Sequence, residues 1–209
     1  MRPLLRAFAL LLALIVAGGF LAVAYVTRTG LSARGQPGRL EAFVARRVRD
    51  LAVARHARGL TNPIPRSAEA VEDGLEHFAD HCAICHANDG SGNTEMGRNM
   101  WPRAPDMRRA ETQRLSDGEL FWIVEHGIRF TGMPGWGTGD TAGEEASWRL
   151  VHFIRALPEL TPEQLARMEE LNPRSPEEIR QEIEEERFLE GGEAPGGAAA
   201  PHKHPGGQE

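Results

Sequence analysis

Two cysteines and a histidine lie close together in the middle of the chain, as Cys82-Ala83-Ile84-Cys85-His86. In this spacing both thiols can form thioether bonds to the vinyl groups of a haem, and the adjacent imidazole can bind the iron axially. The bare cysteine pair could instead be a thioredoxin-like redox pair, part of a zinc ribbon or a structural disulfide. We find no βαβ pattern around it and no further cysteine. With His86 in place, the sequence predicts one covalently bound haem c.

A methionine is the side chain from which we expect the second axial ligand. Met133 lies in Gly132-Met133-Pro134-Gly135-Trp136, between two predicted helices, where glycine and proline leave the thioether free to reach inward. Any of three earlier methionines could instead be a pocket-filling or surface residue: Met96, Met100 and Met107. We expect Cys82, Cys85, His86 and Met133 to bind the cofactor, with His86 and Met133 as the metal ligands and no catalytic residue.

The elements that position these residues are predicted to be helices within a domain at residues 67–158. Ser116-Asp117-Gly118-Glu119 predicts a capping box for a helix that Gly127 ends. Thr141-Ala142-Gly143-Glu144 predicts a second capping box, for a helix that Pro158 closes. The aromatic residues available to keep water from the cofactor are Trp101, Trp122, Trp136, Phe121 and Phe130.

The first thirty residues contain an apolar segment that could cross a membrane. Residues 7–26 are uncharged and, at about 1.5 Å per residue, would reach about 30 Å, the thickness of a bilayer's hydrocarbon core. Ala22-Val23-Ala24 also fits a signal-peptidase site, but a signal core of about 7–15 residues would be shorter. We expect residues 1–30 to be an anchor or signal segment, with the rest of the chain on the periplasmic or extracytoplasmic side.

Charge divides the chain into a basic first third and an acidic remainder. Residues 1–67 sum to +9 and the rest to −15, which together give the net charge of −6. Residues 31–66 are predicted to be a basic juxtamembrane helix and linker. The helix, at residues 39–58, would either rest on anionic lipid headgroups or be solvated. Its apolar side consists of Leu40, Phe43, Val44, Val48 and Leu51.

The C-terminal part is predicted to be a helical extension and a tail. Thr161-Pro162 and Ser175-Pro176 each place a cap residue before a proline at the first helical position, so residues 159–190 read as two helices. Residues 191–209 consist mainly of Gly, Ala, Pro and His and are expected to be disordered.

The segment at residues 67–158 resembles the class I cytochromes c, of the short bacterial single-haem type. The resemblance rests on Gly74 and Phe78 before Cys82-Ala83-Ile84-Cys85-His86, on the turn at Met133, and on Leu150 and Phe153 in the closing helix. It implies an all-α cytochrome c-like fold in which Gly74 meets Phe153. It also implies that the carbonyl of Pro102 or Pro105 accepts the ring N–H of His86.

The resemblance implies a membrane-anchored electron carrier or electron-transfer subunit, not an enzyme, that passes single electrons between respiratory partners. Residues 68–158 carry a net charge of −7, so we expect a redox protein partner with a basic docking face. We expect neither nucleic acid nor a small-molecule substrate. The alternative is a haem-containing subunit, sensor or enzyme in which Met133 is absent from the iron. Peroxide, nitric oxide or carbon monoxide could then bind at the open position.

Overall fold

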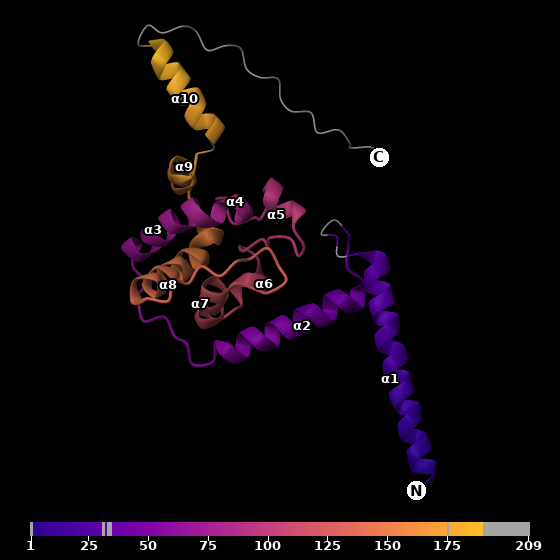
Figure 1. Cartoon of the computed structure of the whole chain (residues 1–209). Coiled ribbons are helices and arrows are strands. Elements are labelled where there is room, and N and C mark those ends of the chain that lie inside the picture. The colour runs from indigo at the N-terminus through magenta and orange to yellow at the C-terminus, as the bar shows by residue number, and fades with distance from the viewer. Residues whose placement is uncertain (1, 31, 33–34, 175, 190–209) are drawn as a thin grey trace. The chain divides into compact units, whose positions relative to one another are not determined.

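The computed structural model describes residues 2–30, 32, 35–174 and 176–189, and all regular structure in these residues is helical (Figure 1). This confirms the predicted all-α class. The chain forms two compact units, one through Leu171 and one from Asn172 onward, which we describe separately. The helices before the central domain are α1 (Arg2–Thr29) and α2 (Arg39–His56). The others are α3 (Ala68–His77), η1 (Phe78–Cys82), α4 (Ala83–His86), α5 (Glu95–Asn99), α6 (Ala110–Gln113), α7 (Asp117–His126), α8 (Thr141–Ala156), η2 (Leu157–Glu159), α9 (Pro162–Leu171) and α10 (Pro176–Leu189).

Helix α1 is long and apolar enough to cross a membrane. Its stretch Pro3–Arg28 has 26 residues, and within it an 18-residue window has a mean hydropathy of 2.6 and no residue buried inside the protein. The expectation that this segment is long enough to span a bilayer is therefore confirmed. A signal sequence near the N-terminus has the same properties.

The centre of the domain that carries the cysteine motif at residues 82–86 is the crossing of α3 and α8 (Figure 1). Gly74 in α3 lies directly against α8, where an added Cβ would overlap the Arg149 carbonyl oxygen and stand 2.8 Å from the Phe153 Cβ. The Phe78 and Phe153 rings pack at 5.1 Å, and both side chains are fully buried. The predicted contact of Gly74 with Phe153 is confirmed. Only glycine lets the two helix backbones approach this closely.

Helix α9 packs onto this core, although the sequence predicts that its residues belong to a C-terminal helical extension. Met168 is fully buried, and Arg167 pairs with Glu76 at 3.1 Å across the surface of α3. The predicted start of α9 is confirmed, because the Thr161 and Gln164 side chains each accept a hydrogen bond from the other's backbone N–H. The apolar core thus extends beyond the closing helix.

Two other predicted helix starts have different outcomes. Ser116 and Glu119 form the full capping box of α7, and Gly127 ends that helix at a φ of 63°. Helix α8 begins as expected, but its cap is Asp140 rather than Thr141. The Asp140 carboxylate accepts a hydrogen bond from the Gly143 N–H at 2.8 Å. Asp and Thr are both good cap residues, and the sequence places them side by side, so local preference alone could not choose between them.

The linker before α3 is fastened to α8 by polar contacts. Asn62 donates from its amide to the Trp148 carbonyl at 3.1 Å, and His152 bonds to the Ile64 carbonyl at 2.8 Å through its Nε2. His152 is buried, so these contacts satisfy a polar side chain inside the domain. The Asn62-Pro63-Ile64-Pro65 segment is therefore part of the domain's packing.

The second unit contains α10, a polar helix. All of its described side chains are exposed. Arg174 forms an ion pair with Glu182 at its start. Ser175, the predicted cap, and the tail at residues 191–209 lie outside the described residues.

The helix crossing leads to a stability prediction. We expect Gly74→Ala to lower the free energy of unfolding by about 1–3 kcal/mol, because its Cβ would force α3 and α8 apart. Urea unfolding of the full chain in detergent, followed by tryptophan fluorescence, measures the change. Gly38→Ala is the matched control, since no heavy atom lies within 4 Å of its added Cβ. Equal stability of both variants would contradict the close crossing.

Candidate functional site

The cysteine motif lies at the end of α3, after a change of helix type. The segment η1 is a π turn in which the Ala83 N–H bonds to the Phe78 carbonyl five residues earlier. Such turns inside helices often occur at functional sites. Because Phe78 is fixed in the α3–α8 core, the π turn places Cys82, Cys85 and His86 on one short turn beside that core. The structure thus brings these three predicted site residues together.

The two cysteines are free thiols with raised pKa values. Burial, with the neighbouring Cys85 and Asp80, raises the pKa of Cys82 to about 12, and burial also raises the pKa of Cys85. Both therefore stay protonated at neutral pH. A thioredoxin-like pair needs a reactive thiolate, and a zinc site needs further ligands. No cluster of three or more His, Cys, Asp or Glu suited to a metal ion occurs in the part of the chain that the structure describes.

His86 is held as a neutral imidazole. Burial lowers its pKa, and the Pro105 carbonyl raises it to a smaller extent. Its Nδ1 atom is buried and has no hydrogen-bond partner within the described residues, so the Pro105 carbonyl is near the ring without bonding to Nδ1 at ordinary geometry. Of the two prolines expected beside His86, it is Pro105 whose carbonyl influences the ring. A neutral imidazole is the form that binds a metal.

The backbone after His86 is bent tightly around the motif. Ala87 ends α4 with a φ of 60°, which is rare for a residue with a side chain and is typical of functional sites. The Gly92 N–H donates to the His86 carbonyl at 2.7 Å, and the Thr94 hydroxyl donates to the Cys85 carbonyl at 3.1 Å. These contacts satisfy carbonyls at the end of a very short helix.

Thr94 and Gly97 are site residues that the sequence reasoning missed. Thr94 caps α5 by accepting a hydrogen bond from the Gly97 N–H at 2.8 Å, and Gly97 lies against the Cys85 carbonyl where a Cβ would overlap it. The order Thr-x-x-Gly directly after a glycine-rich stretch was the available signal, because threonine is a preferred helix cap. Its contact with the motif required the tertiary structure.

Met133 is half-buried in the loop between α7 and α8. Its N–H donates to the Thr131 hydroxyl at 3.1 Å, and its carbonyl accepts from the Ile128 N–H at 3.0 Å. Three residues later, the Trp136 ring meets His81 edge-on at 5.4 Å, one residue before Cys82. The Met133 loop therefore lies against the start of the cysteine turn.

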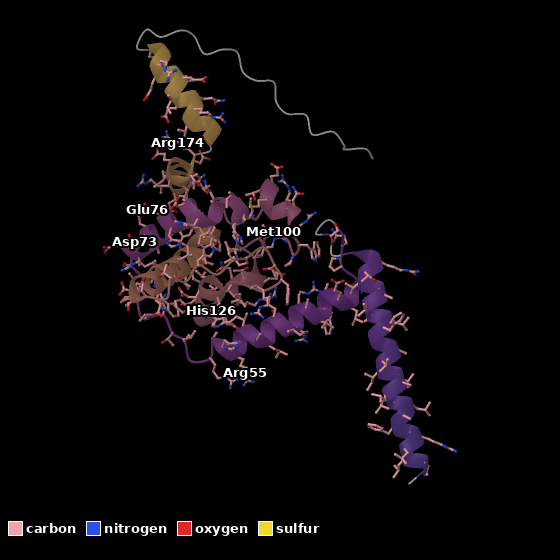
Figure 2. All side chains as sticks on the ribbon, viewed as in Figure 1. Arg55, Asp73, Glu76, Met100, His126 and Arg174 are labelled. Carbon is pink, nitrogen blue, oxygen red and sulfur yellow. The ribbon has the colours of Figure 1, made fainter. Side chains whose placement is uncertain are left out.

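The three alternative methionines differ in their surroundings. Met107 is a buried core residue, and Met96 is 51 % exposed. Met100 lies at the end of α5 (Figure 2), with its sulfur 2.7 Å from where a Cβ on Gly132 would stand. Met100 therefore packs against the loop that carries Met133, so an experiment on the axial ligand must compare these two. Met133 as the ligand stays a prediction.

Phe130 packs on none of the protein core. Its side chain is 95 % exposed, and its backbone has a positive φ of 62°. Phe121 belongs to the core, where it stacks on Trp148 at 3.9 Å. Trp136, in contact with His81, is the expected aromatic residue that the structure places beside the motif.

An acidic residue holds the loop that carries Pro105. Asp106 pairs with Arg108 at 2.8 Å and with Arg109 at 3.1 Å, and Arg108 also pairs with Asp89 at 2.8 Å. Hydrogen bonds from Arg108, and to a lesser extent from Arg109, lower the pKa of Asp106 to about 2, although burial opposes this. The ion pairs thus join the Pro105 loop to the chain that follows His86.

The residues present fit a covalently held haem. Two protonated thiols and a buried neutral imidazole with an unpartnered nitrogen lie on one turn, and a methionine loop packs beside it. A helical domain whose first and last helices cross at a glycine and an aromatic residue, with this turn between them, defines a c-type cytochrome domain.

Comparison with known families agrees with this class. The model of the family of cytochrome c oxidase, cbb3-type, subunit III matches residues 69–154. This segment is therefore similar to the cytochrome c domains of that family. The match runs from α3 to α8 and includes Cys82, Cys85, His86 and Met133.

Two curated proteins are similar to the chain. The Cbb3-type cytochrome c oxidase subunit FixPc of Rhizobium leguminosarum bv. viciae is 35 % identical over 111 residues, which are 50 % of this chain and 33 % of that protein. The Cbb3-type cytochrome c oxidase subunit FixP of Azorhizobium caulinodans is 42 % identical over 45 residues, 22 % of this chain and 15 % of that protein. The alignments thus span a third or less of these relatives' length.

The Asp106 ion pairs predict a pH-dependent contribution to stability. The pKa of Asp106 is below its ordinary 3.8, so its ionised form stabilises the folded protein above about pH 4, and this contribution is lost as the pH falls toward 2. We expect Asp106→Asn to lower the free energy of unfolding by about 1 kcal/mol at neutral pH, allowing for the partial exposure of both arginines.

Urea unfolding across this pH range measures the effect, since urea, unlike guanidinium chloride, adds no salt that would screen the ion pairs. The difference between Asp106→Asn and the unchanged chain should shrink as the solution is acidified. A difference that is constant with pH would show that the carboxylate charge is not what holds the loop.

Proposed function

We propose that this chain is a membrane-anchored c-type cytochrome that holds one covalent haem c and passes single electrons between respiratory partners. The observation that carries the proposal is the turn with Cys82, Cys85 and the neutral His86, in a segment that matches the model of a cytochrome c oxidase subunit family. The electron-transfer component itself performs no substrate chemistry.

Each site residue has a defined part in this proposal. Cys82 and Cys85 would hold the ring covalently, and His86 and Met133 would bind the iron. Haem supplies a one-electron iron couple whose reduction potential an axial methionine raises. The Pro105 carbonyl orients the His86 ring, which is the usual way a histidine ligand is fixed and made more basic. With both axial positions filled by protein, small molecules have no free position on the iron.

The anchor and the relatives indicate where the domain works. Helix α1 holds the chain in the membrane, and we place the haem domain on the periplasmic side. Arginines beside a membrane span favour the cytoplasmic side, but long domains can be translocated despite them. Both similar proteins are named as subunits of cbb3-type oxidases, so we propose that the partners include components of such a respiratory complex.

The charge of the domain indicates how a redox partner would recognise it. Residues 68–158 carry a net charge of −7, which favours a partner with a basic docking face. Association should therefore slow as salt is added.

The axial methionine can be tested by substitution. We expect Met133→Ala to open the iron, so that the reduced protein binds carbon monoxide readily, whereas the unchanged chain does not. Met100→Ala is the matched control, since Met100 packs against the same loop, and it should leave the absorption spectrum unchanged. Carbon monoxide binding by the unchanged chain would support the open-iron alternative, and an effect confined to Met100→Ala would show that Met100 is the ligand.

Covalent attachment can be tested at the thiols. Acid–acetone treatment removes haem that is held without covalent bonds. We expect the unchanged chain to retain all of its haem through this treatment, and the double variant with Cys82→Ser and Cys85→Ser to retain none. Haem that stays on the double variant would contradict the assignment of these cysteines.

A further inference from the structure

Helix α2 carries an apolar side that the proposed electron transfer does not use. Leu40, Val48 and Leu51 are 75 %, 62 % and 71 % exposed, and Phe43 and Val44 are about half exposed. At about 100° per residue, these five side chains fall within a single side of the helix. An exposed apolar stripe of this length on a folded protein indicates an interaction surface.

The opposite side of α2 packs on the haem domain. Val53 is buried, and His56 stacks on Trp122 of α7 at 5.3 Å. Just after the helix, Ala57 is buried and lies beside Gly118 of α7. The domain therefore covers one side of α2 near its C-terminal end and leaves the apolar stripe uncovered.

Arginines lie within the stripe, at Arg47 and Arg55, and around the rest of the helix. Residues 39–58 contain six arginines and only two acidic residues, and one of these, Asp50, is paired with Arg49 at 2.7 Å. Arg47 lies within the stripe, and its guanidinium is 5.7 Å from the centre of the Phe43 ring. An arginine stem along apolar surface, with the charge at its tip, is the arrangement that places the charge at lipid headgroups.

The chain also keeps α2 close to the membrane if α1 remains in it. Helix α1 ends at Thr29 and α2 begins at Arg39, so nine residues connect them. Fully extended, nine residues reach about 30 Å, similar to the length of α2 itself.

We propose that α2 lies in the surface of an anionic membrane, with its apolar stripe at the boundary between headgroups and acyl chains and its arginines on the lipid phosphates. The occupant of the stripe is thus anionic lipid. The proposal rests on the anchor in the proposed function, but not on the haem ligands or on the redox partner. Through the contact of α2 with α7, it holds the haem domain beside the membrane.

The test uses the full haem-loaded chain in vesicles of equal parts phosphatidylcholine and phosphatidylglycerol. A nitroxide is attached at Leu51→Cys, on the stripe, or at Ala45→Cys, a matched exposed position about 120° around the same helix. The native cysteines are occupied by haem, so the label attaches only at the introduced cysteine. Electron paramagnetic resonance then compares relaxation by oxygen, which enters lipid, with relaxation by a water-soluble nickel complex.

We expect the oxygen-to-nickel ratio to be several-fold higher at Leu51→Cys than at Ala45→Cys. The ratio should fall at position 51 when phosphatidylcholine alone is used or when salt is raised, because the arginines then lose their lipid partners. An unchanged haem absorption spectrum shows that both variants are folded.

The other outcomes overturn the proposal in distinguishable ways. If the chain fails to float with the vesicles, that result contradicts both the membrane anchor and the surface helix. If the chain floats and the labels at positions 51 and 45 have equal oxygen-to-nickel ratios and are accessible to nickel, then α2 is solvated. The anchor and the proposed electron transfer are not contradicted by that result. A position 51 shielded from both reagents shows that protein, a partner or a second copy, covers the stripe.

Discussion

The close contact of Gly74 with the backbone of α8 is the constraint on which the site depends. Because no Cβ separates the two helices there, the Phe78 and Phe153 rings meet directly beside the crossing. The π turn begins at Phe78, so the position of every residue in the cysteine turn is set from that ring onward. A shift of the crossing would displace both thiols and the imidazole together.

The environment of the turn then determines its chemistry. Burial keeps the Cys82 thiol protonated and the His86 ring neutral, because it disfavours the charged form of each group. These protonation states suit a site that is completed by a covalent cofactor and a metal, and they do not suit a thiolate redox pair. The loops that follow supply what the short helix lacks, because Gly92 and Thr94 bond to its last carbonyls and Pro105 stands near the imidazole.

Several helix ends and one helix contact of this domain were predicted from the sequence. The features that could not be predicted have physical reasons. The capping box at Ser116 and the contact of Gly74 with Phe153 were predicted correctly, since each depends on a few residue types at fixed spacing. The cap of α8 was placed one residue late because Asp140 and Thr141 are nearly equivalent as caps. The positive φ of Phe130, whose side chain is exposed, could not be predicted, because no sequence pattern reports a positive φ for phenylalanine.

The sequence by itself determined the helical class and the apolar N-terminal segment, and it predicted the cofactor chemistry, because these follow from the types and spacing of neighbouring residues. Only the tertiary structure decided that Pro105 rather than Pro102 influences His86, that Thr94 and Gly97 enclose the cysteine turn, and that Met168 in α9 belongs to the core. Each of these depends on which distant segments meet. That is set by how the helices pack around the Gly74 crossing, and helix packing is not encoded in any short stretch of the chain.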